Sequence, residues 1–160
     1  MLSPADLQAF IERGGIAAEI IWPAAPTPTV ETAAAAVGAR PEQIVKSVLF
    51  LIAGKPLLAI VCGLRRVDDR RLARHFAVGR KQVRLADGAT VLTHTGYPAG
   101  AVPPFGHVAP LSTVLDPLVL AQALVFAGGG SDRTLLRVTP AEIARVTQAE
   151  ILAVLEDDHN

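Results

Sequence analysis

One lysine stands inside an apolar run of the chain, and it is the side chain best placed to do chemistry. Lys46 lies in segment 44–53, in which seven of the ten residues are Val, Ile, Leu or Phe. Such a run predicts a strand that is buried on both faces. An ammonium group buried there without a partner costs roughly several kcal/mol. Lys46 therefore either reaches solvent past the strand end or points into a cleft, where it meets an anionic or oxygen-rich ligand.

A second chemical feature is the basic segment 65–84. Eight of its twenty residues are Arg or Lys, and only Asp68 and Asp69 oppose them. Arginine binds phosphate well because its planar guanidinium forms two parallel hydrogen bonds. The segment therefore predicts a local patch for phosphates. A solvated helix face with ordinary surface arginines remains the alternative.

The third feature is segment 96–107, which has three glycines and three prolines among its twelve residues. This composition predicts a stiff, irregular loop. Its glycines allow close backbone approach and its prolines restrict the chain. Such a loop can present backbone N–H groups to a ligand oxygen, although many loops of this kind are plain connectors.

The surrounding pattern predicts the elements that hold these features. Helices are expected at 4–13, 30–37, 68–76, 86–93 and 139–146, and strands at 19–22, 44–53, 57–62, 82–85, 112–115, 123–127 and 135–138. Ser3, Thr29 and Thr139 are expected helix caps. The short turn between 44–53 and 57–62 predicts a hairpin. Because helices and strands alternate without a βαβ rhythm, we expect an α+β fold with a mixed, partly barrel-like sheet flanked by helices.

Composition limits the class of protein. The chain has 160 residues, 51% hydrophobic and 19% charged, which suits a single domain over 1–160 with a sizeable core. Its formal net charge is zero, so no overall field attracts nucleic acid and any such contact must be local. No secretory signal or membrane-spanning stretch is visible in the sequence, which predicts a cytoplasmic protein.

Several common site types are not expected. The single cysteine, Cys62, cannot form an intrachain disulfide or a cysteine-based zinc site. The histidines lack metal-ligand spacing, so no metal site is expected. There is no Walker loop, and the glycines at 128–130 do not match a dinucleotide fingerprint, so no cofactor is expected.

Taken in order, the motifs resemble the YbaK/prolyl-tRNA synthetase-associated editing domain family. The resemblance covers about Pro4 to Leu152 and depends on Thr29, Ile44-Val45-Lys46-Ser47, Gly96-Tyr97-Pro98, the Gly-x-x-x-Pro loop from Gly100 to Pro104, and Ala127-Gly128-Gly129. Members of this family hydrolyse the ester of wrongly charged tRNA, commonly tRNA(Pro) carrying alanine or cysteine. Their fold is a mixed sheet, partly closed into a barrel.

The resemblance implies a role for each motif. It assigns catalysis to Lys46, Gly100, Ala101 and Val102. It assigns substrate binding to Thr29, Ser47, Pro103, Pro104, His107, Ala127, Gly128 and Gly129. With the basic segment it implies tRNA contacts at Arg65, Arg66, Arg70 and Arg74. The cysteine-specific branch has a serine where this chain has Phe126, which favours another small amino acid such as alanine.

The sequence thus predicts a trans-editing aminoacyl-tRNA deacylase without metal or cofactor. Its expected partners are the acceptor end of mischarged tRNA, in particular tRNA(Pro), and prolyl-tRNA synthetase. The alternative is a non-catalytic module that binds aminoacyl-tRNA or a nucleotide-like ligand in the same cleft. Both hypotheses require Lys46 to face that cleft.

Overall fold

The computed structural model describes residues 1–158. The helices are α1 (Pro4–Gly14), α2 (Val30–Val37), α3 (Asp69–His75), α4 (Gly88–Thr95), α5 (Pro117–Leu120) and α6 (Pro140–Thr147), with single 3-10 turns η1 (Pro41–Gln43) and η2 (Arg80–Gln82). The strands are β1 (Ala18–Ile21), β2 (Val45–Ile52), β3 (Lys55–Cys62), β4 (Val83–Leu85), β5 (Ser112–Leu115), β6 (Val125–Gly128), β7 (Leu135–Val138) and β8 (Glu150–Ile151). No helix in this part of the chain has the length and apolar character needed to cross a membrane.

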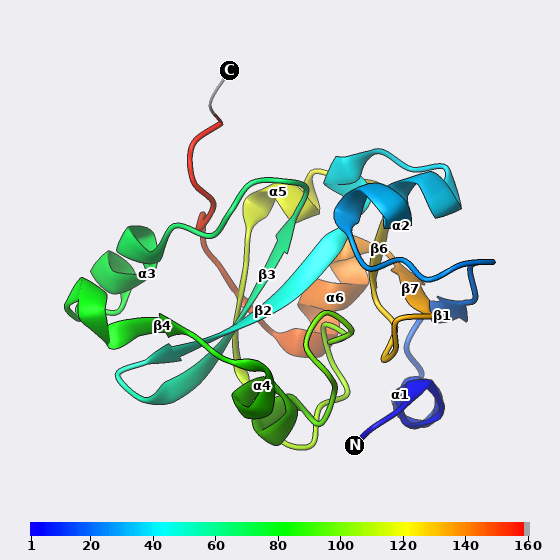
Figure 1. Ribbon diagram of the computed structural model, residues 1–160, viewed down its shortest axis with the longest axis horizontal. Coiled ribbons are helices and arrows are strands. Elements are labelled where there is room, and N and C mark those ends of the chain that lie inside the picture. Colours follow the sequence, from blue (N-terminus) through cyan, green and yellow to red (C-terminus); the bar gives the residue numbers. More distant parts are fainter. Residues whose placement is uncertain (159–160) are drawn as a thin grey trace.

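The strands form two sheets, and helices flank both of them (Figure 1). One sheet is antiparallel, in the order β1-β7-β6. The other is mixed, in the order β4-β2-β3-β5-β8, with parallel pairing on the β5 side. A single parallel bridge between Ile44 and Phe126 connects them. The predicted mixed α+β class is confirmed, and the two sheets do not close into a barrel.

The β2–β3 hairpin is the longest element of the fold and crosses the middle of the molecule (Figure 1). Ala53 and Gly54 form its turn, and both have positive φ angles, 49° and 82°. Two such residues match the right-handed twist of the strands, which explains the tight connection. The predicted hairpin is therefore confirmed.

Alternate residues of this hairpin supply two separate cores. Leu49 and Ile60 face a core shared with α1, α4, α6 and the three-stranded sheet. Phe50 and Ala59 face the opposite core, which contains residues of α3 and of the segment after β8. The five-stranded sheet thus lies between two hydrophobic cores.

The prediction that strand 44–53 is buried on both faces was wrong. Lys46, Ser47 and Val48 are only partly buried. The reason is incomplete pairing, because β4 pairs only with Phe50 to Ile52, while β6 reaches only Ile44. Between these contacts the outer edge of β2 is open.

Most predicted element ends are displaced by a few residues, and two elements were not predicted. The helix expected at 86–93 begins later because Asp87 is its cap and accepts a hydrogen bond from Thr90 N–H at 2.8 Å. The one-turn helix α5 and the two-residue strand β8 are too short to show a periodic pattern. The expected caps Ser3, Thr29 and Thr139 lie at the N-termini of α1, α2 and α6.

Glu142 links α6 to the start of the three-stranded sheet and provides a test of this packing. Its carboxylate accepts hydrogen bonds from Ala17 N–H at 2.7 Å and from Arg145 at 2.6 Å. These bonds lower the pKa of Glu142 to about 2. Since this pKa is below its ordinary value of 4.5, the contribution to stability is present above pH 4.5 and is lost as the pH falls toward 2.

We expect Glu142→Gln to lower the free energy of unfolding by about 1 kcal/mol at pH 7. The difference from wild type should shrink as the pH is lowered. Urea denaturation at pH 7 and pH 3 measures both effects. Glu19→Gln is the matched control, because Glu19 is exposed and makes no ion pair within residues 1–158. Equal stability of the two variants at pH 7 would contradict the role of Glu142.

Candidate active site

A cleft of about 320 Å³ opens where β2 lacks a neighbouring strand. Its walls come from the segment before α2, from α4, from β6 and from the loop that follows α4. The residues predicted from sequence that line it are Thr29, Lys46, Ser47, Gly100, Val102, Ala127 and Gly128. Segments more than eighty positions apart in the chain therefore meet in one cavity.

Lys46 lies in this cleft on the open part of β2, half-buried and opposite Val61 of β3. No carboxylate of residues 1–158 forms an ion pair with its ammonium. Burial is the main cause of the lowered pKa of Lys46, and the nearby Arg66 lowers it further. Cys62 and Glu31 act in the opposite direction without offsetting burial. A half-buried ammonium without a protein partner is available to a ligand oxygen.

The loop from Gly100 to Pro104 is fixed by backbone contacts. Ala101 N–H donates to Pro98 C=O at 3.1 Å, and Ala101 C=O accepts from Gly130 N–H at 2.9 Å. In the described chain, the N–H groups of Gly100 and Val102 donate no hydrogen bond. Two free backbone donors in residues that line a cleft are suited to stabilise a developing oxyanion.

Gly128 allows this loop to pack against β6. A Cβ atom at position 128 would meet the carbonyl oxygen of Val102, and would come within 2.8 Å of its carbonyl carbon and 3.0 Å of that of Ala101. These neighbours are backbone atoms, so no side-chain rotation can relieve the overlap. Glycine is therefore required here by the close approach of two chain segments.

His107 holds the loop through a hydrogen bond to its backbone. Its Nε2 lies 2.8 Å from Pro103 C=O, so Nε2 carries the proton and donates to the carbonyl oxygen. Burial lowers the pKa of His107, and the bond to Pro103 only partly opposes this shift. The imidazole is therefore neutral at pH 7, and it holds the loop without lining the cleft.

The hydroxyl groups of the cleft have different surroundings. Thr29 caps α2, with its Oγ1 accepting from Thr32 N–H at 3.1 Å. Ser47 lines the cleft, but its own Oγ is buried and has no hydrogen-bond partner among the described residues. Ser47 therefore lines the cleft, but its hydroxyl group is not exposed there.

Besides His107, four of the predicted substrate-contact or catalytic residues lie just outside this cavity. Ala101 lines an adjoining groove beside the N-terminal residues, and Pro103 and Pro104 are buried within the loop. Gly129 packs against the chain at Thr134, where a Cβ would lie 2.7 Å from the carbonyl carbon. Their placement makes them supports of the cleft wall.

The structure divides the predicted basic segment into two groups. Arg66 lies near Lys46 at the end of the hairpin, close enough to affect its pKa. Arg70 and Arg74 lie on α3, which packs against the second core of the five-stranded sheet, and they line a separate hollow. Arg66 and Arg70 are therefore only four positions apart in the sequence, but Arg66 lies near Lys46 and Arg70 lines the hollow at α3.

Sequence reasoning missed the apolar part of the cleft. Leu49, Val91 and Leu135 line it together with Thr27 and Pro28. The first three belong to hydrophobic segments whose pattern indicates core positions, so no signal distinguished them. The proline-rich turn before α2 was visible, but nothing in it indicated a cavity.

The chemistry available in the cleft is electrostatic. No Asp, Glu, His or Cys is among its lining residues. Within residues 1–158 there is no group of three or more such side chains that could hold a metal ion. The cleft thus offers an ammonium, free backbone N–H groups and apolar walls, which can bind an ester and stabilise negative charge on its carbonyl oxygen.

Comparison with known proteins identifies the class to which this site belongs. The family model of the aminoacyl-tRNA editing domain matches residues 24–146. A crystal structure described as a candidate trans-editing enzyme for prolyl-tRNA synthetase superimposes with a TM-score of 0.89 and 34% identity, covering 98% of this chain and 100% of that chain. The chain therefore belongs to the aminoacyl-tRNA editing domain family. The predicted resemblance is confirmed, and with it the enzyme class, a hydrolase acting on the aminoacyl-tRNA ester bond.

Two curated relatives show how this domain is used elsewhere. A proline–tRNA ligase of Desulfovibrio desulfuricans is 32% identical over 131 residues, which are 81% of this chain and 22% of the ligase. The multifunctional Ser/Thr-tRNA deacylase ProXp-y of Escherichia coli is 33% identical over 98 residues, 60% of this chain and 57% of that protein. Similar segments thus occur within a synthetase and in a separate deacylase.

Gly128→Ala tests the contact that shapes the cleft. We expect the added methyl group to displace the Gly100–Pro104 loop and to lower the free energy of unfolding by about 1–3 kcal/mol. Hydrolysis of mischarged tRNA should fall by about 10²-fold, because small displacements of catalytic donors have effects of that size. Thermal unfolding and single-turnover hydrolysis measure these effects.

Gly79→Ala is the matched control, since a Cβ at that position meets nothing within 4 Å. It should leave both stability and hydrolysis close to wild type. A Gly128→Ala variant with unchanged stability and hydrolysis would show that the loop and β6 do not depend on this contact.

Proposed function

We propose that this protein removes a small amino acid, such as alanine, from mischarged tRNA(Pro). The observation that carries the proposal is the convergence of Lys46 with Gly100 and Val102 in one cleft of about 320 Å³. The N–H groups of Gly100 and Val102 donate no hydrogen bond within residues 1–158. Membership of the editing domain family supplies the reaction class. The similarity to part of a proline–tRNA ligase supports tRNA(Pro) as the tRNA.

In the proposed reaction, water attacks the carbonyl carbon of the ester that joins the amino acid to the terminal ribose. The oxyanion that forms accepts hydrogen bonds from the backbone N–H groups of Gly100 and Val102. The carbon–oxygen bond to ribose then breaks, and the ribose oxygen takes up the proton that the attacking water loses. Because the lining residues within 1–158 include no Asp, Glu, His or Cys to act as general base, a free ribose hydroxyl of the substrate orients the attacking water, as the family resemblance implies.

Lys46 anchors the terminal phosphate or ribose in this proposal. Thr29, Ser47, Ala127 and Gly128 line the path of the aminoacyl end. Ala101, Pro103, Pro104, His107 and Gly129 keep the loop and the adjoining turn in place. Each group therefore has a role in binding or positioning that agrees with where it lies.

Size is the basis of amino-acid selection in this cleft. Leu49, Val91 and Val102 form apolar walls, and no lining carboxylate is present to hold a charged side chain. A wall of this kind excludes proline by shape, although one methylene changes binding by only about 1–3 kcal/mol. Serine and threonine are the natural competitors to alanine, because the Escherichia coli relative is a Ser/Thr-tRNA deacylase.

The arginines contribute to binding of the tRNA body. We assign phosphate contacts to Arg66, which lies near Lys46, to Arg65, whose guanidinium donates to Glu156 C=O at 3.3 Å, and to Arg70 and Arg74 on α3. Prolyl-tRNA synthetase is the proposed protein partner, since it is the enzyme that produces mischarged tRNA(Pro). A cytoplasmic location goes with that partner.

A panel of mischarged tRNAs tests the proposed function. The purified protein is incubated with tRNA(Pro) carrying alanine, serine, threonine or cysteine and with correctly charged prolyl-tRNA(Pro), and release of free amino acid is measured. We expect fastest release from alanyl-tRNA(Pro) and none from prolyl-tRNA(Pro). Tight binding without release of any amino acid would instead support the non-catalytic binding module.

Substitution of Lys46 tests its place in the mechanism. Lys46→Ala should reduce hydrolysis by about 10²-fold or more, the scale for loss of one preorganised electrostatic contact. Lys46→Arg should restore little, because the wide guanidinium does not fit where a compact ammonium binds. Lys55→Ala is the matched control, since Lys55 is an exposed lysine at the other end of the same hairpin. Turnover of the Lys46→Ala variant at the wild-type rate would remove Lys46 from the mechanism.

The same variant should be as stable as wild type or more stable at neutral pH. The folded protein disfavours the charged form of Lys46, whose pKa is lowered from its ordinary value of 10.5. The gain in stability from Lys46→Ala should therefore be full at neutral pH and disappear as the pH rises toward 10.5. Chemical denaturation at pH 7 and at pH 10 measures this difference.

A further inference from the structure

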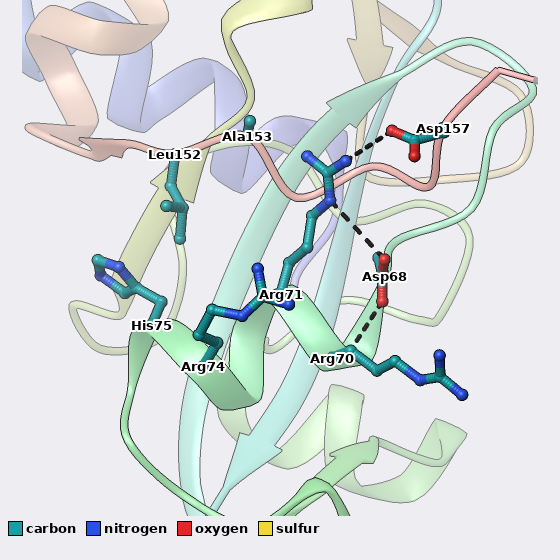
Figure 2. Close-up of a pocket in the computed structure, with 8 residues that line it drawn as sticks. All are labelled: Asp68, Arg70, Arg71, Arg74, His75, Leu152, Ala153 and Asp157. Carbon is teal, nitrogen blue, oxygen red and sulfur yellow. Dashed lines mark hydrogen bonds and ion pairs between the residues drawn. The ribbon is translucent and has the colours of Figure 1, made fainter.

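A second concave surface lies on the α3 side of the five-stranded sheet and shares no lining residue with the cleft. It has a volume of about 540 Å³ and is formed by α3 and the segment after β8. Figure 2 shows the residues that line it, and most of them are charged. They include Arg70, Arg71, Arg74 and His75 from α3, and Asp157 from the C-terminal segment.

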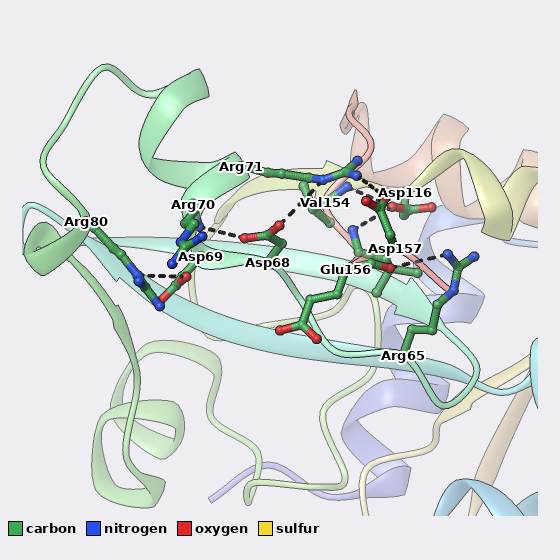
Figure 3. A network of polar contacts seen from close by, with 11 residues as sticks. Arg65, Asp68, Asp69, Arg70, Arg71, Arg80, Asp116, Val154, Glu156 and Asp157 are labelled. Carbon is green, nitrogen blue, oxygen red and sulfur yellow. Dashed lines mark hydrogen bonds and ion pairs between the residues drawn. The ribbon is translucent and has the colours of Figure 1, made fainter. Parts of the chain in front are cut away.

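The C-terminal segment is firmly attached where it passes this surface. The carboxylate of buried Asp116 accepts hydrogen bonds from Val154 N–H at 2.8 Å and from Leu155 N–H at 3.3 Å (Figure 3). Val154 C=O in turn accepts from Asp68 N–H at 2.6 Å. These bonds fix the chain just before Asp157, so its position beside α3 is part of the fold.

The arginines of this surface differ in their partners. Arg71 donates to Asp157 at 2.7 Å and lies 3.7 Å from Asp68 (Figure 2). Arg70 and Arg74 are exposed and form no ion pair within the described chain. In Figure 2 the side chain of Arg74 extends toward Arg71, whereas that of Arg70 extends from the start of α3 away from Asp157. Of the three arginines that line the hollow, Arg71 is thus paired with two carboxylates, Asp68 and Asp157, and Arg70 and Arg74 are paired with none within residues 1–158.

We propose that this surface is a second RNA-binding site, at which backbone phosphates replace Asp157 on Arg71 and pair with Arg70 and Arg74. The identification of RNA as the ligand rests on the proposed function. The carboxylate of Asp157 is a weak competitor, because its side chain is 82% exposed and exposed ion pairs contribute little to stability. A phosphate that contacts several guanidiniums through bidentate hydrogen bonds is bound more strongly.

The position of this surface determines what it contacts. It shares no lining residue with the cleft that receives the aminoacyl end, so the phosphates it binds belong to another part of the tRNA than the terminal adenosine. Arg66 lies between the two sites, with its carbonyl bonded to Glu156 N–H at 2.8 Å and its side chain near Lys46. The C-terminal segment thus contacts both regions, because Glu156 bonds to Arg66 near Lys46 and Asp157 pairs with Arg71 of the second site.

Binding of uncharged tRNA by the full chain, measured by fluorescence anisotropy at several salt concentrations, tests the proposal. Asp157→Asn should tighten binding about threefold to fivefold, because it removes the competitor for Arg71. Asp158→Asn is the matched control, since it removes the same charge one residue later, where no ion pair forms within residues 1–158. Its effect should be less than twofold. Equal effects of these two variants would overturn the competition by Asp157.

Two further variants test the pocket itself. Arg70→Ala and Arg74→Ala should each weaken binding and lower the slope of log affinity against log salt by roughly one unit. Unchanged affinity and slope in both variants, with unfolding temperatures equal to wild type, would overturn the second site. Wild-type hydrolysis of mischarged tRNA is measured in parallel. Its absence would count against the proposed function, while the binding comparisons would still decide whether this surface holds RNA.

Discussion

The close approach of Gly128 to the backbone of Ala101 and Val102 is the contact on which the rest of the site depends. It joins the three-stranded sheet to the loop after α4 without an intervening side chain. The hydrogen bond from Gly130 N–H to Ala101 C=O holds the same two segments from the next turn. Within residues 1–158 the N–H groups of Gly100 and Val102, two residues that line the cleft, donate no hydrogen bond, and a ligand oxygen can supply the missing partner.

A second constraint is the incomplete pairing of β2. Strand β4 covers one end of its outer edge and β6 touches the other, so the cleft occupies the place of a missing strand. The same gap explains why Lys46 is tolerated in an apolar segment, since its ammonium is only half-buried and remains accessible. Partial burial of the Lys46 ammonium destabilises the folded protein, and it does so at the position where the proposed reaction needs a positive charge.

The sequence predicted the features that form through contacts between residues close together in the chain, such as helix caps and tight turns. The caps of α2 and α6 and the β2–β3 hairpin were predicted from residues adjacent in the chain, and the family resemblance brought Lys46 together with Gly100 and Gly128. The division into two sheets could not be predicted, because it depends on how far β4 and β6 extend along β2. The separation of Arg70 and Arg74 from the cleft was likewise hidden, since one basic segment passes from Arg66, near Lys46, to α3. The apolar cleft walls had the pattern of ordinary core residues.

The most direct test of the central claim is to locate the aminoacyl end in solution. Amide resonances of the ¹⁵N-labelled protein are followed during titration with a non-hydrolysable analogue, alanine joined by an amide to the 3′ carbon of 3′-deoxyadenosine. Our account predicts saturable shifts at Gly100, Val102, Ala127 and Gly128, and none at α3, because this ligand lacks the phosphates that α3 is proposed to bind. Shifts concentrated on α3, or absent from the cleft at saturation, would contradict it.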